Sequence, residues 1–409
     1  MSRCPFGIMI FMNYAVPVVD LENVQLGAVR AGIEELGAVQ VVNHGVPGED
    51  LGRRMARLLG RPRAAKARLA SPHPYRGWRQ WPDDFGRLEL ERFNVAQFDD
   101  VAEAAAAGVD PEYLGLYAHA NLWPDDDPGL REAARAYMAS CRALAERMLG
   151  LYGQALGVGE DTFFLGPLPH FRLTVNEYPT WTYAGEAGDK LLLLEHADDS
   201  AVTILAQQGD YEGLQLQAPD GEWISVPLVP GALQVFSGTL LVRWAGGRLR
   251  PARHRVVAGG SVTRRSTAVF VYPALEMVVE PLEPFAAGSG SSGSPGSSEF
   301  EPVRVWDHVK DRVADYLAAY GRPEQVAAWR DGTPYVADLA ENSAGRSLRR
   351  AADPVLGARR AGAGLCSVRR CWPCARCARR WACARCARCW PCARCARRWP
   401  CARHVCLST

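Results

Sequence analysis

The segment spanning residues 191–198 constrains the fold most strongly, because it joins a strand pattern to two polar side chains. It reads Leu-Leu-Leu-Leu-Glu-His-Ala-Asp, and a short apolar run of this kind predicts a strand buried in a sheet. Alternate residues of a strand point the same way, so His196 and Asp198 are expected to face one side. The chain must therefore build a sheet that directs both side chains at one point.

A third polar residue completes a candidate metal site. His254 lies far downstream, so it must come from a different strand that the fold brings alongside. Two imidazoles and one carboxylate on one side of an ion leave the opposite positions open, which is the ligand set of non-haem Fe(II) oxygenases. A lone His-x-Asp is usually accidental, and a lone buried His is usually a core residue. The ordered combination of all three residues with the motif that follows favours a metal site.

That following motif lies in residues 264–272, which predict a strand with a carboxylate-binding face. The segment reads Arg-Arg-Ser-Thr-Ala-Val-Phe-Val-Tyr, with Val269 and Val271 on one face. A guanidinium and a hydroxyl two residues apart suit a bidentate carboxylate clamp. The polar face of this strand carries Arg264, Ser266, Ala268, Phe270 and Tyr272.

In the order of these motifs, the chain resembles the isopenicillin N synthase-like Fe(II)/2-oxoglutarate-dependent dioxygenases. The resemblance covers about residues 15–340. Asn176-Glu177-Tyr178-Pro179 is similar to the Asn-x-Tyr-Pro segment that helps to seat the cosubstrate in the family. The other segments that resemble the family are each weak evidence, but they occur in the order that the family shows. They are residues 16–21, 37–47, 221–223, 229–232 and 254–257.

The resemblance implies a mainly β fold with flanking helices, built around a double-stranded β-helix (jelly roll) core. It implies Fe(II) as the metal, 2-oxoglutarate as cosubstrate and dioxygen as oxidant. The residues to which it assigns roles are the metal ligands His196, Asp198 and His254, and the cosubstrate-binding residues Arg264, Ser266, Asn176 and Tyr178.

Further cavity residues are expected on the strand that precedes the Asn-x-Tyr-Pro segment. Arg172 and Thr174 alternate onto the face that carries Asn176. A purely structural role for Arg172 and Thr174 is an equally favoured alternative. His44 is interpreted as a structural residue. The candidate substrate residues are Arg172, Thr174, Phe270 and Tyr272.

The resemblance also implies the reaction: an oxygenase that hydroxylates, desaturates or cyclises a small molecule and releases succinate and CO2. Asp198, present where a halogenase would have a small residue, favours these outcomes over halogenation. Composition rich in Ala, Arg and Gly suggests a high-GC bacterium, and hence a natural-product intermediate or amino-acid derivative as substrate. Two alternatives stay open: an Fe(II) oxidase of the same fold that does not use 2-oxoglutarate, and a nucleic-acid- or metal-binding module.

The domain organisation follows from composition and pattern. The expected parts are an N-terminal extension (1–15), a helical and strand region (16–160), the jelly-roll core (161–285), a Gly/Ser-rich linker (286–300), C-terminal helices (301–345) and an Arg/Cys-rich low-complexity tail (346–409). The expected helices span 23–36, 48–70, 128–157, 302–320 and 323–330; the expected strands span 16–20 and 38–43; and 71–100 is expected to be loop-rich.

The tail carries the basic charge of the chain. Residues 346–409 hold sixteen Arg and one acidic residue, Asp353. Because the whole chain has a formal charge of +2 and the tail +15, the rest sums to −13. An acidic catalytic part lacks the basic footprint of a nucleic-acid-binding protein, so a small molecule is the expected partner.

The tail also holds eleven of the thirteen Cys, in repeated Cys-x-x-Cys pairs such as Cys371 and Cys374. Such pairs can bind zinc, but no apolar pattern lies between them to fold around a metal. We interpret the tail as a non-functional extension, with adventitious metal binding as the alternative. Only Cys4 and Cys141 lie elsewhere, which favours a reducing cytoplasm. No membrane span or secretory signal is expected, and the oligomeric state is left open.

Overall fold

The computed structural model of the chain describes residues 14–82, 88–180, 190–286 and 300–320, with Val326 and Trp329. The chain divides into two units, Met1–Asp353 and Pro354–Thr409, and the second lies wholly outside the described residues. The predicted N-terminal extension, linker and Arg/Cys-rich tail fall outside them almost entirely. So does the predicted helix 323–330, apart from Val326 and Trp329, which are helical.

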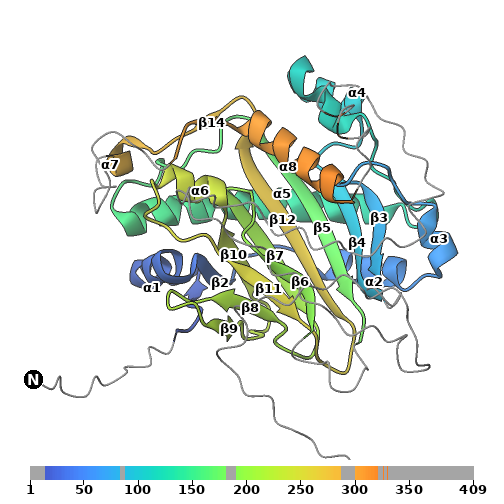
Figure 1. The fold of residues 1–409 in the computed structure, drawn as a ribbon, viewed down its shortest axis with the longest axis horizontal. Coiled ribbons are helices and arrows are strands. Elements are labelled where there is room, and N and C mark those ends of the chain that lie inside the picture. The colour runs from blue at the N-terminus through green and yellow to red at the C-terminus, as the bar shows by residue number, and fades with distance from the viewer. Residues whose placement is uncertain are drawn as a thin grey trace, which may run out of the picture. The chain divides into compact units, whose positions relative to one another are not determined.

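The core of the first unit is a pair of β-sheets with an apolar layer between them (Figure 1). The larger sheet has eight strands in the order β1 (Val18–Asp20), β2 (Ala38–Val42), β10 (Leu233–Ser237), β7 (Val202–Gln208), β12 (Arg264–Ala274), β5 (Pro169–Tyr178), β4 (Leu88–Ala96) and β3 (Gly77–Pro82). Only its β1–β2 pair is parallel among the strands described.

The smaller sheet faces the larger one across this layer. Its four strands run in the order β6 (Leu191–His196), β11 (His254–Val257), β8 (Leu214–Gln217) and β9 (Trp223–Ser225). Leu192 of β6 and Leu216 of β8 pack in one buried cluster with Phe236 of β10 and Ala268 of β12. Two such sheets form the predicted double-stranded β-helix. A separate short pair joins β13 (Val278–Val279) to β14 (Val303–Arg304).

The two faces of strand β12 pack into different apolar clusters. Val269 and Val271 belong to the outer apolar cluster, whereas Ala268 belongs to the layer between the sheets. The side chains of a strand alternate between its two faces, so Arg264 and Ser266 share the inner face with Ala268. This arrangement confirms the predicted division of the strand and aims its polar residues into the β-helix.

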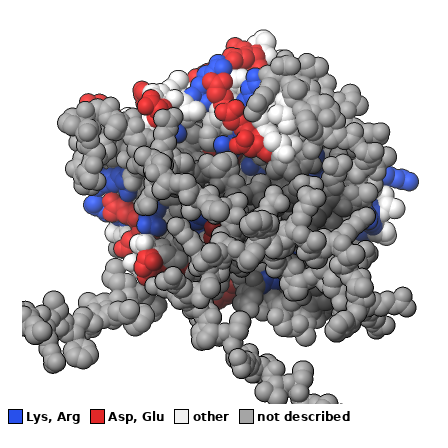
Figure 2. All heavy atoms as spheres, viewed as in Figure 1, with Lys and Arg blue, Asp and Glu red and all other residues white. Residues whose placement is uncertain are grey.

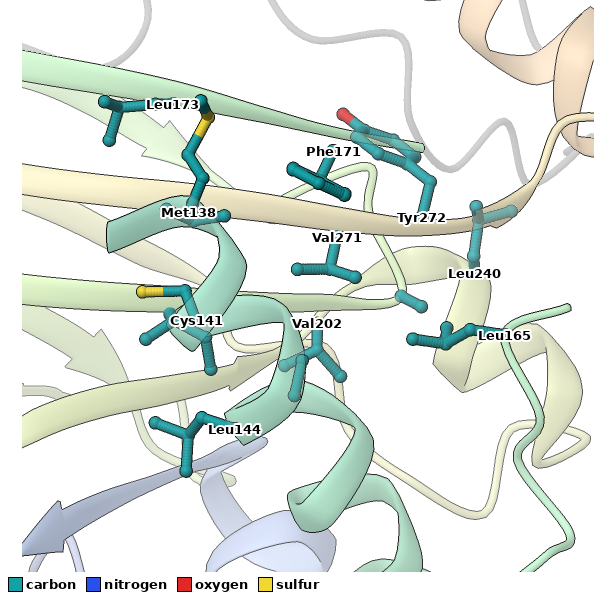
Figure 3. Packing of buried hydrophobic residues seen from close by; sticks show 14 of the residues in the cluster. Met138, Cys141, Leu144, Leu165, Phe171, Leu173, Val202, Leu240, Val271 and Tyr272 are labelled. Carbon is teal, nitrogen blue, oxygen red and sulfur yellow. The ribbon is translucent and has the colours of Figure 1, made fainter. Parts of the chain in front are cut away.

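The outer face of the larger sheet is covered by the long helix α5 (Gly129–Leu156), as predicted for 128–157. Figure 3 shows Met138, Cys141 and Leu144 of this helix packed towards Val202 and Val271 of the sheet. Each side chain is at most 4% exposed. Fully burying an aliphatic side chain contributes roughly 1.5–3 kcal/mol, so this contact stabilises the sheet.

Shorter helices surround this core: α1 (Leu26–Ala31), the π-helical η1 (Gly32–Leu36), α2 (Glu49–Leu59), α3 (Arg63–Ala67), α4 (Val101–Ala106), the 3-10 helix η2 (Pro111–Tyr117), α6 (Thr239–Trp244), α7 (Glu283–Ala286) and α8 (Val305–Tyr320). The predicted helices 23–36 and 302–320 are confirmed by α1 with η1 and by α8. The first of these ends at Gly37, whose φ of +67° and close approach to the backbone of Arg250 suit only a residue without a side chain.

Two predictions for the N-terminal half were wrong. The predicted helix 48–70 is broken into α2 and α3 at Gly60-Arg61-Pro62, because Pro62 has no N–H to continue the first helix and instead precedes the second. The stretch 71–100 is not loop-rich but holds the β3–β4 hairpin, in which Trp78 lies opposite Phe93. Both rings are buried, so these aromatic residues are core residues of an edge hairpin.

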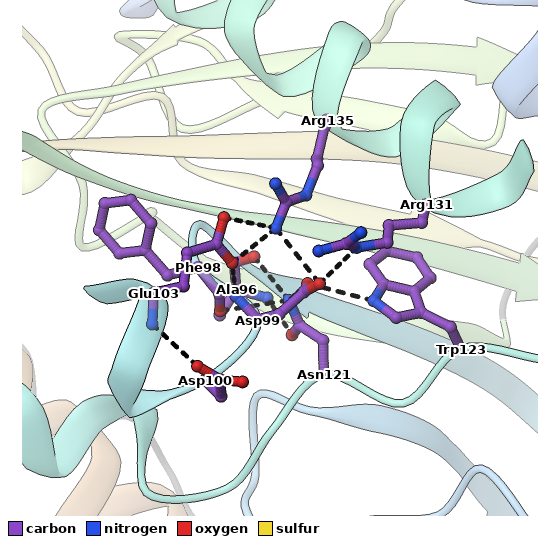
Figure 4. A network of polar contacts seen from close by, with 9 residues as sticks. All are labelled: Ala96, Phe98, Asp99, Asp100, Glu103, Asn121, Trp123, Arg131 and Arg135. Atoms are coloured by element: carbon purple, nitrogen blue, oxygen red, sulfur yellow. Dashed lines mark hydrogen bonds and ion pairs between the residues drawn. The ribbon is translucent and has the colours of Figure 1, made fainter. Parts of the chain in front are cut away.

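A polar network fastens the segment after β4 to α5 (Figure 4). The carboxylate of Asp99 accepts hydrogen bonds from Asn121, Trp123 and Arg131, and Glu103 accepts from Arg135. Burial alone would raise the pKa of Asp99, but these donors outweigh it and hold the pKa below its ordinary value.

The described surface carries mixed charge. Figure 2 shows acidic and basic side chains interleaved over the part of one face that the described residues form. Several charges of the described residues are paired, as Arg304 is with Glu112 and Asp307. No described helix combines the length and the apolar character that a membrane crossing requires.

Candidate metal and cosubstrate site

The predicted metal ligands meet at one end of the smaller sheet. His196 ends β6 and lies directly opposite His254, the first residue of β11. Their ring centroids are 4.3 Å apart, and Nε2 of His196 lies 3.6 Å from Oδ1 of Asp198. One ligand atom from each of the three residues falls within 4.8 Å of the others. This spacing suits a single divalent cation.

Each imidazole is oriented by the carbonyl oxygen of the residue two positions before it. Nδ1 of His196 lies 2.8 Å from the carbonyl oxygen of Leu194, and Nδ1 of His254 lies 2.8 Å from that of Ala252. An Nδ1–H that donates to a carbonyl fixes the tautomer in which Nε2 carries the free lone pair. Each ring therefore offers Nε2 to the common point, as metal binding requires.

Asp198 reaches the metal-binding point from a loop, whereas the sequence predicted that it would lie on the strand. The predicted strand 191–198 ends at His196, so Asp198 lies in the following loop rather than on the strand. Its carbonyl oxygen accepts a 2.8 Å hydrogen bond from the backbone N–H of Thr239, at the start of α6. The strand ends early because the chain must turn from the smaller sheet towards β7 of the larger one.

The protonation state of the buried histidine also suits a metal. Burial and the neighbouring His196 lower the pKa of His254 to about 4. At neutral pH this imidazole is therefore uncharged, which is the form that binds a metal ion. The donor set of two neutral imidazoles and one carboxylate is that of Fe(II) oxygenases.

A buried guanidinium lies on the larger sheet beside this site. Arg264 is 1% exposed, and its Nη2 donates a 2.7 Å hydrogen bond to Oε1 of Gln207. Its Nε and Nη1 have no hydrogen-bond partner among the described residues, and neither has the hydroxyl of Tyr178. Unpaired buried donors are costly, so the arrangement fits an anion that accepts from them, such as the distal carboxylate of 2-oxoglutarate.

The remaining predicted cosubstrate residues lie next to Arg264. Ser266 lies opposite Asn176, and Arg264 lies opposite Tyr178, on the paired strands β12 and β5. Nδ2 of Asn176 donates to Oγ of Ser266 at 3.3 Å. The structure thus brings together all four residues that the sequence motifs indicated.

Sequence reasoning missed two residues of this cluster, Gln207 and Arg92. Nε of Arg92 donates a 2.6 Å hydrogen bond to Oδ1 of Asn176 and so orients that amide towards Ser266. Gln207 enters because β7 pairs with β12 in a register that sets it opposite Ser266. Neither residue lies in a motif, and only the strand register could have identified them.

The predicted substrate residues lie further along the same strands. Arg172 lies opposite Phe270, and its guanidinium carbon is 3.9 Å from the centre of that ring. Nη2 of Arg172 is 3.3 Å from the hydroxyl of Tyr272. Thr174 donates to Oδ1 of Asn94 at 2.9 Å, a contact that suits its structural alternative.

His44, interpreted from the sequence as structural, is hydrogen-bonded within its own turn and to a loop. Its Nδ1 accepts from the N–H of Val46 at 3.0 Å, and its Nε2 lies 2.9 Å from the carbonyl oxygen of Gly231. Both ring nitrogens are therefore engaged away from the metal ligands.

A double-stranded β-helix with two histidines and a carboxylate at one end, and a buried guanidinium beside them, defines a non-haem Fe(II) oxygenase. Comparison with known proteins gives the same class. Residues 171–273 match the model of the 2OG-Fe(II) oxygenase superfamily. The crystal structure of the dioxygenase for auxin oxidation in rice shares the fold with a TM-score of 0.54 and 22% identity, over 74% of this chain and 96% of that one.

Curated relatives extend the likeness over more than two thirds of the chain. Validamycin A dioxygenase of Streptomyces hygroscopicus subsp. limoneus is 31% identical over 68% of this chain and 83% of its own length. Flavonol synthase/flavanone 3-hydroxylase of Arabidopsis thaliana is 28% identical over 72% and 84%. The chain belongs to the isopenicillin N synthase-like family of 2OG-Fe(II) oxygenases, enzymes that use Fe(II), 2-oxoglutarate and dioxygen.

Proposed function

We propose that this dioxygenase hydroxylates, desaturates or cyclises a small molecule, either a natural-product intermediate or an amino-acid derivative. Oxidation of the substrate would be coupled to conversion of 2-oxoglutarate into succinate and CO2. The observation that carries the proposal is the buried guanidinium of Arg264, with two N–H-bearing atoms unpartnered among the described residues, beside the cluster of His196, Asp198 and His254.

The roles of individual residues follow from their positions. His196, Asp198 and His254 would hold Fe(II), which supplies the activation of dioxygen when it is bound. Arg264 and Ser266 would hold the distal carboxylate of 2-oxoglutarate, with Asn176 and Tyr178 beside them. Gln207 accepts a hydrogen bond from Arg264, and Arg92 donates one to Asn176. These bonds keep the anion-binding cluster in one geometry before the cosubstrate arrives, which reduces the entropy lost on binding.

The substrate would lie beyond the metal, towards Arg172, Phe270 and Tyr272. These side chains share the inner face of β5 and β12 with the cosubstrate residues. The relative named for validamycin A is a bacterial protein, which supports a natural product as substrate. A cytoplasmic location is also proposed, since outside the tail the sequence has only two Cys, and Cys141 is a buried free thiol.

One alternative chemistry remains testable. A relative that is 28% identical is named 1-aminocyclopropane-1-carboxylate oxidase, so an Fe(II) oxidase that does not consume 2-oxoglutarate is the second candidate. The Arg-x-Ser motif occurs in such oxidases too, and the donors of Arg264 that are unpaired among the described residues suit any anion, so the formation of succinate is what separates the two candidates.

The test is a screen of small molecules with the full chain, Fe(II), 2-oxoglutarate and oxygen. Mass spectrometry would detect a product changed by +16 or −2 mass units, and succinate would be measured in the same mixtures. We expect succinate to form in proportion to product. Substrate oxidation and oxygen consumption without succinate would instead establish the oxidase.

A further inference from the structure

Arg172, on the inner face of the β-helix, has an unusual environment for a largely enclosed arginine. Its guanidinium carbon lies 4.3 Å from the ring centre of Tyr75 and 3.9 Å from that of Phe270. Aromatic faces attract a guanidinium and fix its plane, but they do not accept its in-plane hydrogen bonds as a carboxylate does. The side chain is 12% exposed, so few of these bonds can go to bulk water.

The charge of Arg172 is only loosely balanced. Its hydrogen bonds run to the neutral hydroxyls of Thr174 and Tyr272, both at 3.3 Å. Among the described residues, the carboxylate in ion-pair range is Asp199, at 3.8 Å. That carboxylate accepts a shorter bond, 2.7 Å, from the hydroxyl of Tyr272. Charge-assisted bonds normally measure about 2.7–2.9 Å, so Arg172 retains capacity for a closer anion.

Another arginine of the same two strands provides the contrast. Arg265, on the opposite face of β12, donates from Nε to Oε2 of Glu177 at 2.5 Å. That pair lies across adjacent strands, at positions that face each other. Within the described part of the chain, the fold therefore supplies a close carboxylate partner for Arg265 but not for Arg172.

A small cavity adjoins the guanidinium of Arg172. It has a volume of about 20 Å³ and is also lined by Arg76, Arg312, His170 and Asp199. Burial, followed by the nearby Arg76 and Arg172, lowers the pKa of His170 to about 3, so this ring is uncharged. Arg312 is paired with Asp315 at 3.0 Å, and Arg76 donates to the carbonyl oxygens of Tyr75, Leu116 and His119. The case for an anion in this cavity therefore rests on Arg172.

The chain connects this cavity to the metal site and separates it from Arg264. Asp199 directly follows the metal ligand Asp198, and consecutive Cα atoms are about 3.8 Å apart. Phe270, against which Arg172 packs, is six strand residues from Arg264, a span of about 20 Å. A molecule held at Arg172 can therefore approach the metal without competing for the site around Arg264.

We propose that Arg172 binds a carboxylate of the primary substrate. The substrate would then be a small organic acid, held beside Asp199, the residue that follows the metal ligand Asp198. This inference rests on the proposed oxygenase function and adds the chemical class of its substrate. The rings of Tyr75 and Phe270 hold the guanidinium in place, and the hydroxyl of Tyr272 keeps Asp199 engaged while the acid binds.

The test compares acids with their amides. Hexanoate and phenylacetate, each paired with its primary amide, would be titrated calorimetrically into the full chain with Fe(II) and saturating 2-oxoglutarate, without oxygen. Saturating cosubstrate prevents the probes from binding at Arg264. A charge-assisted bond is worth about tenfold or more in affinity. We expect at least one acid to bind about tenfold more tightly than its amide.

Variants assign this preference to one side chain. Arg172→Gln should abolish the preference for the acid, and Arg172→Lys should retain part of it. Arg265→Gln removes one guanidinium from the opposite face and should leave it unchanged. Binding of 2-oxoglutarate, followed by the absorbance of its complex with Fe(II), should be the same in all of these proteins, which shows that each is folded.

The two possible failures are distinguishable. If the wild-type protein binds 2-oxoglutarate but prefers no acid to its amide at millimolar concentration, the assignment of Arg172 is overturned and the proposed function stands. A preference that survives in Arg172→Gln overturns it equally. If the wild-type protein does not bind 2-oxoglutarate at all, the proposed function itself fails.

Discussion

His196 and His254 lie directly opposite each other on the antiparallel strands β6 and β11, and each imidazole is held by a carbonyl oxygen two residues earlier in the chain. The two rings therefore offer the same nitrogen, Nε2, to one point. The third ligand, Asp198, is positioned from the loop that leads to β7. Removal of one ligand leaves two residues that still face an ion but no longer enclose one side of it.

His254→Ala is expected to abolish turnover and to weaken Fe(II) binding by more than about 100-fold. Mutation of residues that merely support metal ligands costs about 10–100-fold, and loss of a ligand costs more. Metal content after anaerobic equilibration measures the effect. The matched control is His44→Ala, since the ring nitrogens of His44 contact Gly231 and Val46 instead. Unchanged Fe(II) affinity in His254→Ala would show that the third ligand is another residue.

Gln207→Ala is expected to weaken 2-oxoglutarate binding about fivefold, less than loss of Arg264 itself. Gln207 accepts one hydrogen bond from the guanidinium of Arg264, and such a bond contributes about 1 kcal/mol. Anaerobic titration of the Fe(II) protein with 2-oxoglutarate gives the dissociation constant. An effect as large as that of Arg264→Leu would mean that Gln207 binds the cosubstrate directly rather than positioning Arg264.

Asp99→Asn is expected to lower the melting temperature at neutral pH but not in acid. The pKa of Asp99 is below its ordinary value of 3.8, because hydrogen bonds from Asn121 and Arg131 outweigh the effect of burial. A lowered carboxyl pKa contributes stability above the ordinary value that is lost as the pH falls through the folded-state value. The difference in melting temperature between wild type and variant should shrink below pH 3.8. A difference independent of pH would assign the effect to packing.

A chain that ends after residue 345 is expected to fold and to turn over substrate like the full chain. The tail is a low-complexity Cys-Ala-Arg repeat without apolar periodicity, so it offers nothing to bury in a core. Melting temperature, iron content and succinate formation compare the two proteins. If truncation removes iron binding or activity, the Cys-x-x-Cys pairs belong to a working metal-binding module.

The candidate site could be predicted in large part from the sequence. His196, Asp198 and His254 form a known ligand set at recognisable spacing, and the period-2 pattern of β12 placed Arg264 and Ser266 on the inner face. Asp198 was expected at the correct point although the strand stops short of it. The His-x-Asp motif therefore indicates the position of Asp198 even though the predicted strand is two residues longer than β6.

The remaining features depend on long-range pairing that local patterns do not encode. The β3–β4 hairpin was missed because Trp78 and Phe93 are buried and aromatic residues recur without a clear alternation. With the hairpin missed, Arg92 could not be placed beside Asn176. Gln207 similarly depends on the register of β7 against β12. The break between α2 and α3 is signalled by Pro62, which the prediction of one helix over 48–70 overlooked.

The most direct test of the account is the affinity of Arg264→Leu for 2-oxoglutarate, compared with that of Arg265→Leu. The first substitution removes the buried guanidinium whose charge-assisted contact is worth roughly 1.5–3 kcal/mol, or about one to two decades in affinity. The second removes an arginine that is paired with Glu177 on the opposite face. The measurement is the absorbance of the Fe(II)–2-oxoglutarate complex, titrated without oxygen.

We predict at least a tenfold higher dissociation constant for Arg264→Leu with Fe(II) still bound, and a value near that of the wild type for Arg265→Leu. Equal effects of the two substitutions, or a wild-type protein that binds Fe(II) but gives no 2-oxoglutarate complex, would contradict the account.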